Sequence, residues 1–520
     1  MTAMLIALPQ GFNVSGVTLW GVRLAGALTA RGHTVGLAVH AEPPAQNRLD
    51  FDLDSRVRLF DMRDLPPLAS ADGLLAPWIA RYRDALHALA PASSEPVVFS
   101  PNLHGDCYGI GAAITQVEPD LVRLVGWQHS DIEYDARVLT HYAPVLGAFV
   151  AVSHQIELIL RDRLAPRAAD IEQIPYGVEV PPAPPPRTPI AGRPLRLLYT
   201  GRIEHEQKRV RAFIHLTDML TQRGISHRLT LLGDGPASHE IDAACRSRPA
   251  LRRCPPTSPA GVRQALAEHD AFILASRYEG LSVAMLEALA AGCVPIVTAV
   301  RSGAAQAIRD GRNGLLAQAS PDDDDAATAL ALADAVERFL RADTQAMSRA
   351  AWSDATERFS IERHTDRVEA LLERLVHAPP RSWPTMRPCA FSSTGGSGSG
   401  SVPVEAAERL RTLLGSLSGK TIALHGAGRH TIELASILAH APANIVALTD
   451  DDPARHGQTC LGWPILAPAE VASAHVTDVI ISSWMHHEAI WSRRDVYERR
   501  GVRLHRLYDP PDAARAATQP

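Results

Sequence analysis

The sequence is poor in cysteine and contains no long hydrophobic run. Its six cysteines are scattered along 520 residues without the paired CxxC spacing of a zinc site, which fits a reducing compartment. No charge-free run of about eighteen apolar residues is present, and the opening MTAMLIALPQGF lacks the basic segment of a signal peptide. We therefore expect a cytoplasmic protein without a transmembrane segment.

The net charge is also low, because 52 basic residues against 57 acidic ones give −5. Proteins that neutralise a nucleic-acid backbone or dock on an anionic membrane usually carry a basic surplus, so a nucleic-acid partner is not expected. Hydrophobic residues make up 46% and charged residues 21% of the chain, as in folded globular proteins. A length of 520 residues is about three times that of one compact domain and predicts two or three domains.

Residues 1–180 alternate between short apolar runs and amphipathic stretches. Strand-like runs occur at Met4–Leu8, Thr34–Val39, Val97–Ser100, Val122–Gly126 and Ala148–Val152, with a helix-like segment at Val17–Ala30. This rhythm predicts an amino-terminal α/β domain with one parallel sheet covered by helices. Six prolines between Pro181 and Pro189 then predict an extended connector, which is a candidate hinge.

The α/β rhythm restarts over residues 190–376 and predicts a second domain that ends in a helix near Ile361–Leu375. Residues 379–403 are rich in Pro, Ser and Gly and include STGGSGSGS, which predicts a flexible linker; an engineered fusion linker would have the same composition. Residues 404–512 then predict a smaller Rossmann-like α/β domain, with strand-like runs at Thr421–His425, Ile445–Thr449 and Asp478–Ser482.

Two α/β domains joined by a hinge enclose a cleft at the carboxyl ends of their strands, where such sheets bind ligands. Gly16 closes a glycine-bearing turn before the first helix and would let an anion approach the helix N-terminus, although such turns are as common without a ligand. Gly201 and Arg202 end the strand LRLLYT, and Lys208 follows in the next loop. Two cations there could pair with a diphosphate leaving group; the alternative is solvated surface charge.

The segment ASRYEGLSVAMLEALAAGCVPIV is the most informative one. Seven residues separate Glu279, in a loop, from Glu287, in an apolar helix. Carboxylates accept hydrogen bonds from vicinal hydroxyls, which suits a sugar ring and a ribose. The amides of Gly280, Leu281 and Ser282 at the helix start suit the phosphates between those two rings. Glutamates on a helix more often form a solvated face, but a buried Glu287 would need a polar partner.

In combination and order, these motifs resemble the retaining GT-B glycosyltransferases of family 4. The resemblance covers residues 1 to about 376 and rests on the glycine turn, the E-x7-E segment and four further runs, which are FVAVSHQI, IPYGVEV, YTGRIEHEQK and LLGDGP. It implies a GT-B fold, in which two Rossmann-like domains face a cleft, and a nucleoside-diphosphate sugar held mainly by the second domain.

The resemblance also implies roles for individual residues. Arg202 and Lys208 would bind the donor diphosphate, Glu279 the transferred sugar and Glu287 the ribose. The backbone at Gly280, Leu281 and Ser282 would bind phosphate, joined by Gly16 and Gly201. The family's usual lysine and glycine appear here as Lys208 and Arg209, so Arg209 is an alternative to Lys208.

His129, after the strand LVRLVG, matches by placement a histidine that lines the sugar site in relatives, although a lone histidine is as often structural. Asp131 is a weaker candidate for an acceptor contact. The family implies neither a carboxylate nucleophile nor a metal, and no DxD motif stands in a context that would suggest magnesium. The run Asp322–Asp325 is typical of a solvated turn or helix start.

In the third domain, Gly426 and Gly428 form a partial dinucleotide-binding loop, and Asp450 follows the next strand near where an acidic residue meets a ribose. Nucleotide binding and a catalytically silent scaffold both remain possible for it. For the whole chain, we expect a metal-independent, retaining glycosyltransferase without a cofactor that uses a nucleoside-diphosphate sugar. The alternative is a non-catalytic GT-B scaffold that binds a glycan or stabilises a partner enzyme.

Overall fold

The structure, a computed structural model, describes residues 1–13, 15–40, 51, 53–66, 68, 75–90, 95–102, 104–300, 302–385, 389–391, 404–428, 430–431, 434–438, 441–483 and 487–508. The chain divides into two compact units. The first comprises Met1–Asp131 and Asp135–Phe391, and the second Ile132–Tyr134 and Ser392–Pro520.

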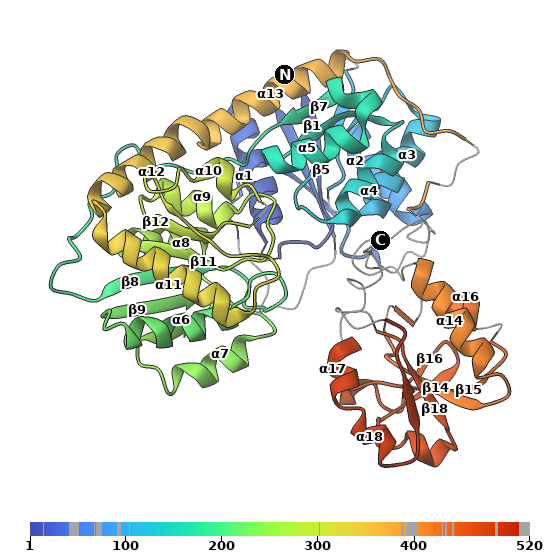
Figure 1. The fold of residues 1–520 in the computed structure, drawn as a ribbon. Coiled ribbons are helices and arrows are strands. Elements are labelled where there is room, and N and C mark those ends of the chain that lie inside the picture. Colours follow the sequence, from blue (N-terminus) through green and yellow to red (C-terminus); the bar gives the residue numbers. More distant parts are fainter. Residues whose placement is uncertain are drawn as a thin grey trace, which may run out of the picture. The chain divides into compact units, whose positions relative to one another are not determined.

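The amino-terminal half of the first unit is a parallel sheet covered by helices (Figure 1). In the described residues the sheet has seven strands in the order β3-β2-β1-β4-β5-β6-β7. The strands are β1 (Ala3–Leu8), β2 (Thr34–Val39), β3 (Arg58–Asp61), β4 (Val97–Ser100), β5 (Val122–Gln128), β6 (Leu146–Ala151) and β7 (Ile171–Gln173). The helices are α1 (Gly16–Ala30), α2 (Ala76–Leu89), α3 (Gly105–Val117), α4 (Glu133–Tyr142), α5 (His154–Arg163) and the 3-10 helix η3 (Ala165–Asp170).

The second half of the unit repeats the arrangement with six described strands in the order β10-β9-β8-β11-β12-β13. These are β8 (Leu195–Thr200), β9 (His227–Leu232), β10 (Leu251–Cys254), β11 (Ala271–Leu274), β12 (Val294–Thr298) and β13 (Leu315–Ala317). The helices are α6 (Arg211–Gln222), α7 (Ser238–Cys245), α8 (Pro259–Glu268), α9 (Val283–Ala290), α10 (Ala304–Ala307), α11 (Asp325–Arg341) and α12 (Thr344–Arg358). Asp324, from the acidic run, caps the start of α11, as expected.

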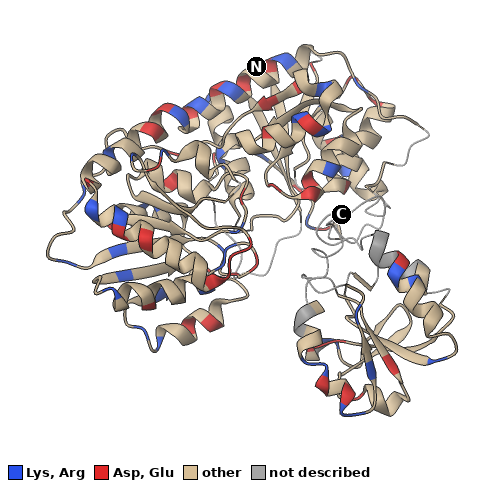
Figure 2. Cartoon of the chain, viewed as in Figure 1, with Lys and Arg blue, Asp and Glu red and all other residues tan. Residues whose placement is uncertain are grey.

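Helix α13 (Ile361–His377) returns to the amino-terminal half and packs against α1. Trp20 of α1 donates from Nε1 to His364 Nε2 at 2.9 Å, and both side chains are buried. Where the chain passes between the two halves, Val178 N donates to Phe359 O at 2.8 Å and Ile361 N donates to Val178 O at 2.9 Å. The two chain crossings between the halves are therefore paired with each other. Acidic and basic residues alternate along the outer face of α13 (Figure 2).

The proline-dense connector has no helix or strand, as predicted, but it is anchored on the second half. Trp352 Nε1 donates to Pro181 O at 2.9 Å, and Gln345 Nε2 donates to Arg187 O at 3.1 Å. The Arg187 guanidinium donates to four carbonyls at the ends of two helices, those of Leu266, Ala267, His269 and Ala291. These contacts hold residues 181–187 against the second half of the unit.

The linker expected from residue 379 starts later than the composition indicates. Trp383 is 1% exposed, donates from its backbone N to Thr115 Oγ1 at 3.1 Å and packs its ring on Tyr142. Farther on, Tyr142 donates to Cys389 O at 2.6 Å. Residues 379–385 and 389–391 thus belong to the first unit, because one tryptophan buries enough surface to order a polar segment. The rest of the expected linker lies outside the described residues.

The second unit contains a third sheet with the described order β16-β17-β15-β14-β18-β19. Its strands are β14 (Thr421–His425), β15 (Asn444–Thr449), β16 (Thr459–Cys460), β17 (Trp463–Leu466), β18 (Asp478–Ile481) and β19 (Arg503–His505). Its helical segments are α14 (Val404–Ser416), α16 (Ala435–Leu438), η5 (Pro453–Arg455), η6 (Val471–Ala474), α17 (His487–Ser492) and α18 (Asp495–Glu498). β16 and β17 pair antiparallel while the other neighbours are parallel, so the predicted small α/β domain carries an antiparallel edge.

Candidate functional site

A cavity of about 310 Å³ lies between the two halves of the first unit, at the carboxyl ends of their strands. It is lined from the first half by the start of α1 and by loops after β5 and β7, and from the second half by loops after β8, β10 and β11. Most site residues expected from the sequence line it, namely Gly16, His129, Gly201, Arg202, Lys208, Glu279, Leu281, Ser282 and Glu287. The topology therefore brings together residues that stand up to 271 positions apart, the span from Gly16 to Glu287.

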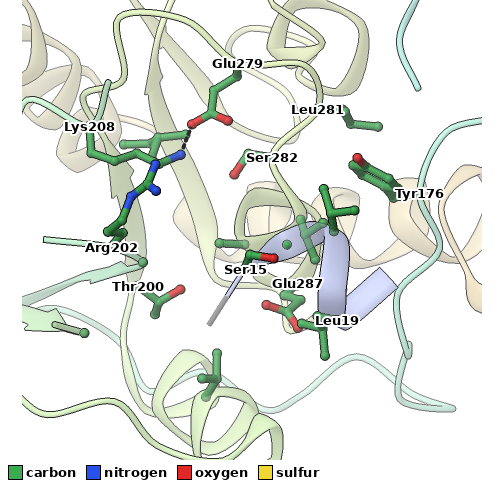
Figure 3. Close-up of a pocket in the computed structure, with 18 of the residues that line it drawn as sticks. Ser15, Leu19, Tyr176, Thr200, Arg202, Lys208, Glu279, Leu281, Ser282 and Glu287 are labelled. Atoms are coloured by element: carbon green, nitrogen blue, oxygen red, sulfur yellow. Dashed lines mark hydrogen bonds and ion pairs between the residues drawn. The ribbon is translucent and has the colours of Figure 1, made fainter. Parts of the chain in front are cut away.

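Lys208 and Glu279 form an ion pair in the cavity wall (Figure 3). Glu279 Oε1 also accepts a hydrogen bond from Ser276 Oγ at 2.7 Å, so a fixed network holds this carboxylate. Arg202 is exposed and donates to Gln207 Oε1 at 3.2 Å; within the described part of the chain it makes no ion pair. The cavity thus offers one cation already neutralised by a carboxylate and a second that is open to an anion.

Arg209, the alternative to Lys208, does not take part in this site. It is fully buried and donates to Thr328 Oγ1 at 2.6 Å and to the carbonyl of Ser320 at 2.9 Å. Its side chain therefore anchors the segment before α11 and leaves Lys208 as the cation that reaches the cavity.

The loop from Glu279 to Ser282 approaches the first half closely. A Cβ atom on Gly280 would lie 2.1 Å from the carbonyl oxygen of His129, so only glycine fits between the two backbones. Ser282 then caps α9, since its Oγ accepts from Met285 N at 3.3 Å. The first turn of a helix leaves N–H groups without intrahelical partners, and those of α9 lie at this cavity.

Gly16 and Gly201 lie on opposite walls of the same cavity. Gly16 starts α1 behind the cap residue Ser15, and a Cβ atom on it would lie 3.3 Å from the Val283 side chain. The N-terminus of α1 therefore faces that of α9. Gly201 has a φ of +151°, which favours glycine. The backbone of Gly233 lies close to it, since a Cβ atom on Gly233 would lie 1.9 Å from Gly201 O.

Glu287 is buried at 8% exposure, and its partner is Arg23 of α1, which is 7% exposed. The arginine Nη2 donates to Glu287 Oε1, so the pair joins the two halves of the unit. The sequence predicts a polar partner for a buried Glu287 but does not indicate which residue it is. A signal was present, because Arg23 is the only charged residue in the otherwise apolar helix α1.

His129 lines the cavity, but its ring is committed to the first half. Nδ1 lies 2.7 Å from Tyr176 Oη, and Nε2 lies 3.4 Å from Asn102 Oδ1. The ring stacks on Trp127 and is 3% exposed. Burial lowers the pKa of His129 to about 3, so the imidazole is neutral near pH 7. These contacts hold the ring in place as part of the cavity wall, and the backbone carbonyl oxygen of His129 lies next to Gly280.

Several residues that line the cavity were not predicted from the sequence. Tyr176 comes from IPYGVEV, whose tyrosine the motif alone does not mark as a site residue. Pro256, Thr257 and Val262 come from the loop after β10 and the start of α8 and form an apolar part of the wall. They carry no titratable group and no spacing pattern that would single them out in the sequence.

In the second unit, Gly426 has a φ of +117° and a Cβ atom on it would lie 2.5 Å from Ser482 O, which accounts for a glycine there. Asp450 Oδ2 accepts from Ala427 N at 2.9 Å, so this carboxylate holds the loop itself. Arg455 Nη1 lies 3.7 Å from where a Cβ atom on Gly428 would be and donates to Ala427 O at 3.0 Å. These contacts hold the backbone of the loop in place.

In the part of the chain that is described, no group of three or more His, Cys, Asp or Glu residues is placed to hold a metal ion. Over the same residues, no helix combines the length and apolar character needed to cross a membrane.

The second half of the first unit is similar in sequence to known proteins. Residues 194–341 match the family of group 1 glycosyl transferases. The alpha-D-kanosaminyltransferase of Streptomyces kanamyceticus is 31% identical over 153 residues, which are 28% of this chain and 36% of that enzyme. The chain spans 25% to 38% of the length of the curated relatives that it matches.

Solved structures share the fold over most of the chain. Sucrose-phosphate synthase from Thermosynechococcus elongatus has a TM-score of 0.58 at 17% identity over 73% of this chain and all of that one. HepE from Anabaena, in complex with UDP-glucose, has a TM-score of 0.54 at 17% identity over 72% of this chain and all of that one. The expected GT-B fold is therefore confirmed.

Proposed function

We propose that this protein, which has a GT-B fold and a group 1 glycosyltransferase domain, transfers a sugar from a nucleoside diphosphate to an acceptor hydroxyl with retention of anomeric configuration. The observation that carries the proposal is the convergence in one cavity of Arg202, Lys208, Glu279 and Glu287 with the start of α9. The likeness to the UDP-glucose complex of HepE supports this class of donor.

The donor diphosphate would lie between Arg202, Lys208 and the amides that start α9, where both cations and helix N–H groups attract negative charge. Glu279 would then accept hydrogen bonds from hydroxyls of the transferred sugar, and Glu287 from the ribose. Because Lys208 is paired with Glu279 before donor binding, the diphosphate would share a cation that is already held in place.

In the transfer step, the bond between the anomeric carbon and the diphosphate oxygen breaks, and the acceptor oxygen attacks the same face of the sugar. The acceptor proton passes to the departing diphosphate, so no separate base is needed. Arg202 and Lys208 stabilise the charge that develops on the leaving group, which is the role that a metal ion fulfils elsewhere. His129 and Tyr176 would shape the wall beside the sugar.

The test is incubation of the protein with UDP-, GDP- and ADP-sugars and candidate glycan, lipid and small-molecule acceptors. We expect free nucleoside diphosphate from one donor class, a product with the donor's anomeric configuration by NMR, and unchanged turnover in EDTA. Arg202→Ala should lower turnover about tenfold to a hundredfold, since it removes a charged hydrogen-bond donor. Arg228→Ala, an exposed arginine on the neighbouring β9, is the matched control.

An inverted product would contradict the retaining mechanism, and loss of turnover in EDTA would contradict metal independence. Saturable binding of a glycan without nucleotide release from any donor would instead identify a non-catalytic scaffold.

A further inference from the structure

Arg23 occupies an unusual position for an arginine. It is the only charged residue of α1, it is 7% exposed, and it points out of its own half of the unit to reach Glu287 of α9. Its second terminal nitrogen, Nη1, is buried and has no hydrogen-bond partner among the described atoms. A buried guanidinium is costly unless a charge compensates it, so Glu287 is the reason that Arg23 is tolerated there.

The carboxylate that Arg23 holds has one occupied and one available oxygen. Oε1 accepts from Arg23, while Oε2 has no hydrogen bond to any residue that the structure describes. Glu287 lines the cavity of the proposed donor site, and it also lines a second cavity of about 300 Å³ whose wall includes Arg23. The ion pair thus lies between the two cavities, and Oε2 of Glu287 is available to accept a hydrogen bond from a ligand.

We infer that Arg23 is a positioning residue for nucleoside recognition, which fixes Glu287 so that its remaining oxygen accepts from the ribose hydroxyls. This inference rests on the proposed function. A guanidinium fixes a carboxylate in orientation better than a mobile lysine does, because the guanidinium is planar and its donors are held in a rigid group. Since Arg23 and Glu287 come from different halves, the same contact makes ribose binding depend on the two halves being closed together.

A purely structural Arg23 would stabilise the closed unit without discriminating between nucleotides. The two roles can therefore be distinguished by one quantity, the ratio of the affinity for a nucleotide with ribose hydroxyls to the affinity for one without them. The probes are UDP, ADP and GDP, each compared with its 2′,3′-dideoxy counterpart. The nucleotide that the wild type binds most tightly, with its dideoxy counterpart, is then used for every variant. The variants are Arg23→Gln and Arg23→Lys in the full chain, with melting temperature measured for each.

In the wild type we expect the hydroxyl-bearing nucleotide to bind at least about tenfold more tightly than its dideoxy counterpart. Without the ribose hydroxyls the buried Glu287 carboxylate lacks a hydrogen-bond partner, which costs binding free energy. Arg23→Gln should reduce that ratio to about threefold or less while the dideoxy affinity changes little, because only the hydroxyl contact depends on an oriented Glu287. Arg23→Lys should give an intermediate ratio. In a Glu287→Gln background, Arg23→Gln should change the ratio no further.

Arg31→Gln is the matched control, since Arg31 ends α1 and pairs with Asp366 and Glu369 of α13, away from the cavity. It should leave the ratio unchanged. A wild-type ratio in both folded Arg23 variants, with Glu287→Gln still reducing it, would overturn the role of Arg23 and leave the proposed function standing. If no nucleoside diphosphate binds the wild type, both fail.

Discussion

Lys208 donates to the carboxylate of Glu279, which links the loop after β8 to the loop after β11 in the wall of the cavity. The side chains of the lysine and the glutamate are 17% and 12% exposed, so solvent screens the ion pair only in part. In the proposed function the two residues have different ligands, since the lysine binds diphosphate and the glutamate binds sugar. The ion pair therefore connects the residue proposed to bind the diphosphate with the residue proposed to bind the sugar.

Glu279→Gln separates these two contributions. Removing the carboxylate charge releases Lys208 for the diphosphate, so the free nucleoside diphosphate should bind as tightly as before or more tightly. Transfer from the intact donor should fall about a hundredfold, because a charged acceptor for sugar hydroxyls is lost. Calorimetric titration and initial rates measure the two effects. A parallel loss of both would show that Glu279 acts through Lys208 alone.

Gly280→Ala should abolish close contact between the halves. The added Cβ would meet the carbonyl oxygen of His129 at 2.1 Å, a backbone atom that cannot rotate away. We expect a large loss of kcat/KM with a melting temperature near that of the wild type, since the halves can move apart without unfolding. Gly26→Ala in α1 is the control, because a Cβ atom there meets nothing within 4 Å. Wild-type activity in Gly280→Ala would contradict the closed geometry.

Asp135 makes stability depend on pH. Burial raises the pKa of its carboxyl to about 7 from 3.8, and Oδ2 has no partner among the described atoms. The folded state thus holds a proton that the unfolded chain releases, so stability falls as pH rises from about 4 to about 7. Asp135→Asn should remove this component and be the more stable protein above pH 7. Urea denaturation across that pH range checks it, and identical pH profiles would refute it.

Trp383→Ala should destabilise the first unit by about 3 to 5 kcal/mol, which is typical for truncating a fully buried aromatic side chain. The tryptophan is 1% exposed and packs on Tyr142. Val117→Ala, which alters a side chain 65% exposed on the adjacent α3, should cost less than about 0.5 kcal/mol. Equal unfolding midpoints for the two variants would mean that residues 379–391 contribute nothing to the fold.

The central strands could be predicted because buried parallel strands are continuous apolar runs. Ala3–Leu8 and Val97–Ser100 are buried at every position, and their bounds agree with the predicted runs to within one residue. In the first unit, the runs RLFD, LRRC and LLA were not predicted, and they form the edge strands β3, β10 and β13. Charged residues interrupt the first two runs and the third is only three residues long, so none of them gives a long apolar signal.

The site was predictable where chemistry and position coincide in the sequence, as for Arg202 directly after an apolar strand. It was not predictable where two distant elements meet. Arg23 and Glu287 are 264 residues apart, and no local pattern states that α1 faces α9. Likewise, the composition of residues 379–391 indicates a linker, while the contact of Trp383 with α3 and α4 is a tertiary fact.

The most direct measurement is calorimetric titration of the full chain with UDP, GDP and ADP, beside Arg202→Ala and Arg228→Ala. The account predicts saturable binding of one nucleotide class, weakened about tenfold to a hundredfold by Arg202→Ala and unchanged by Arg228→Ala. Binding that is equally strong in all three proteins, or absent from the wild type, would contradict it.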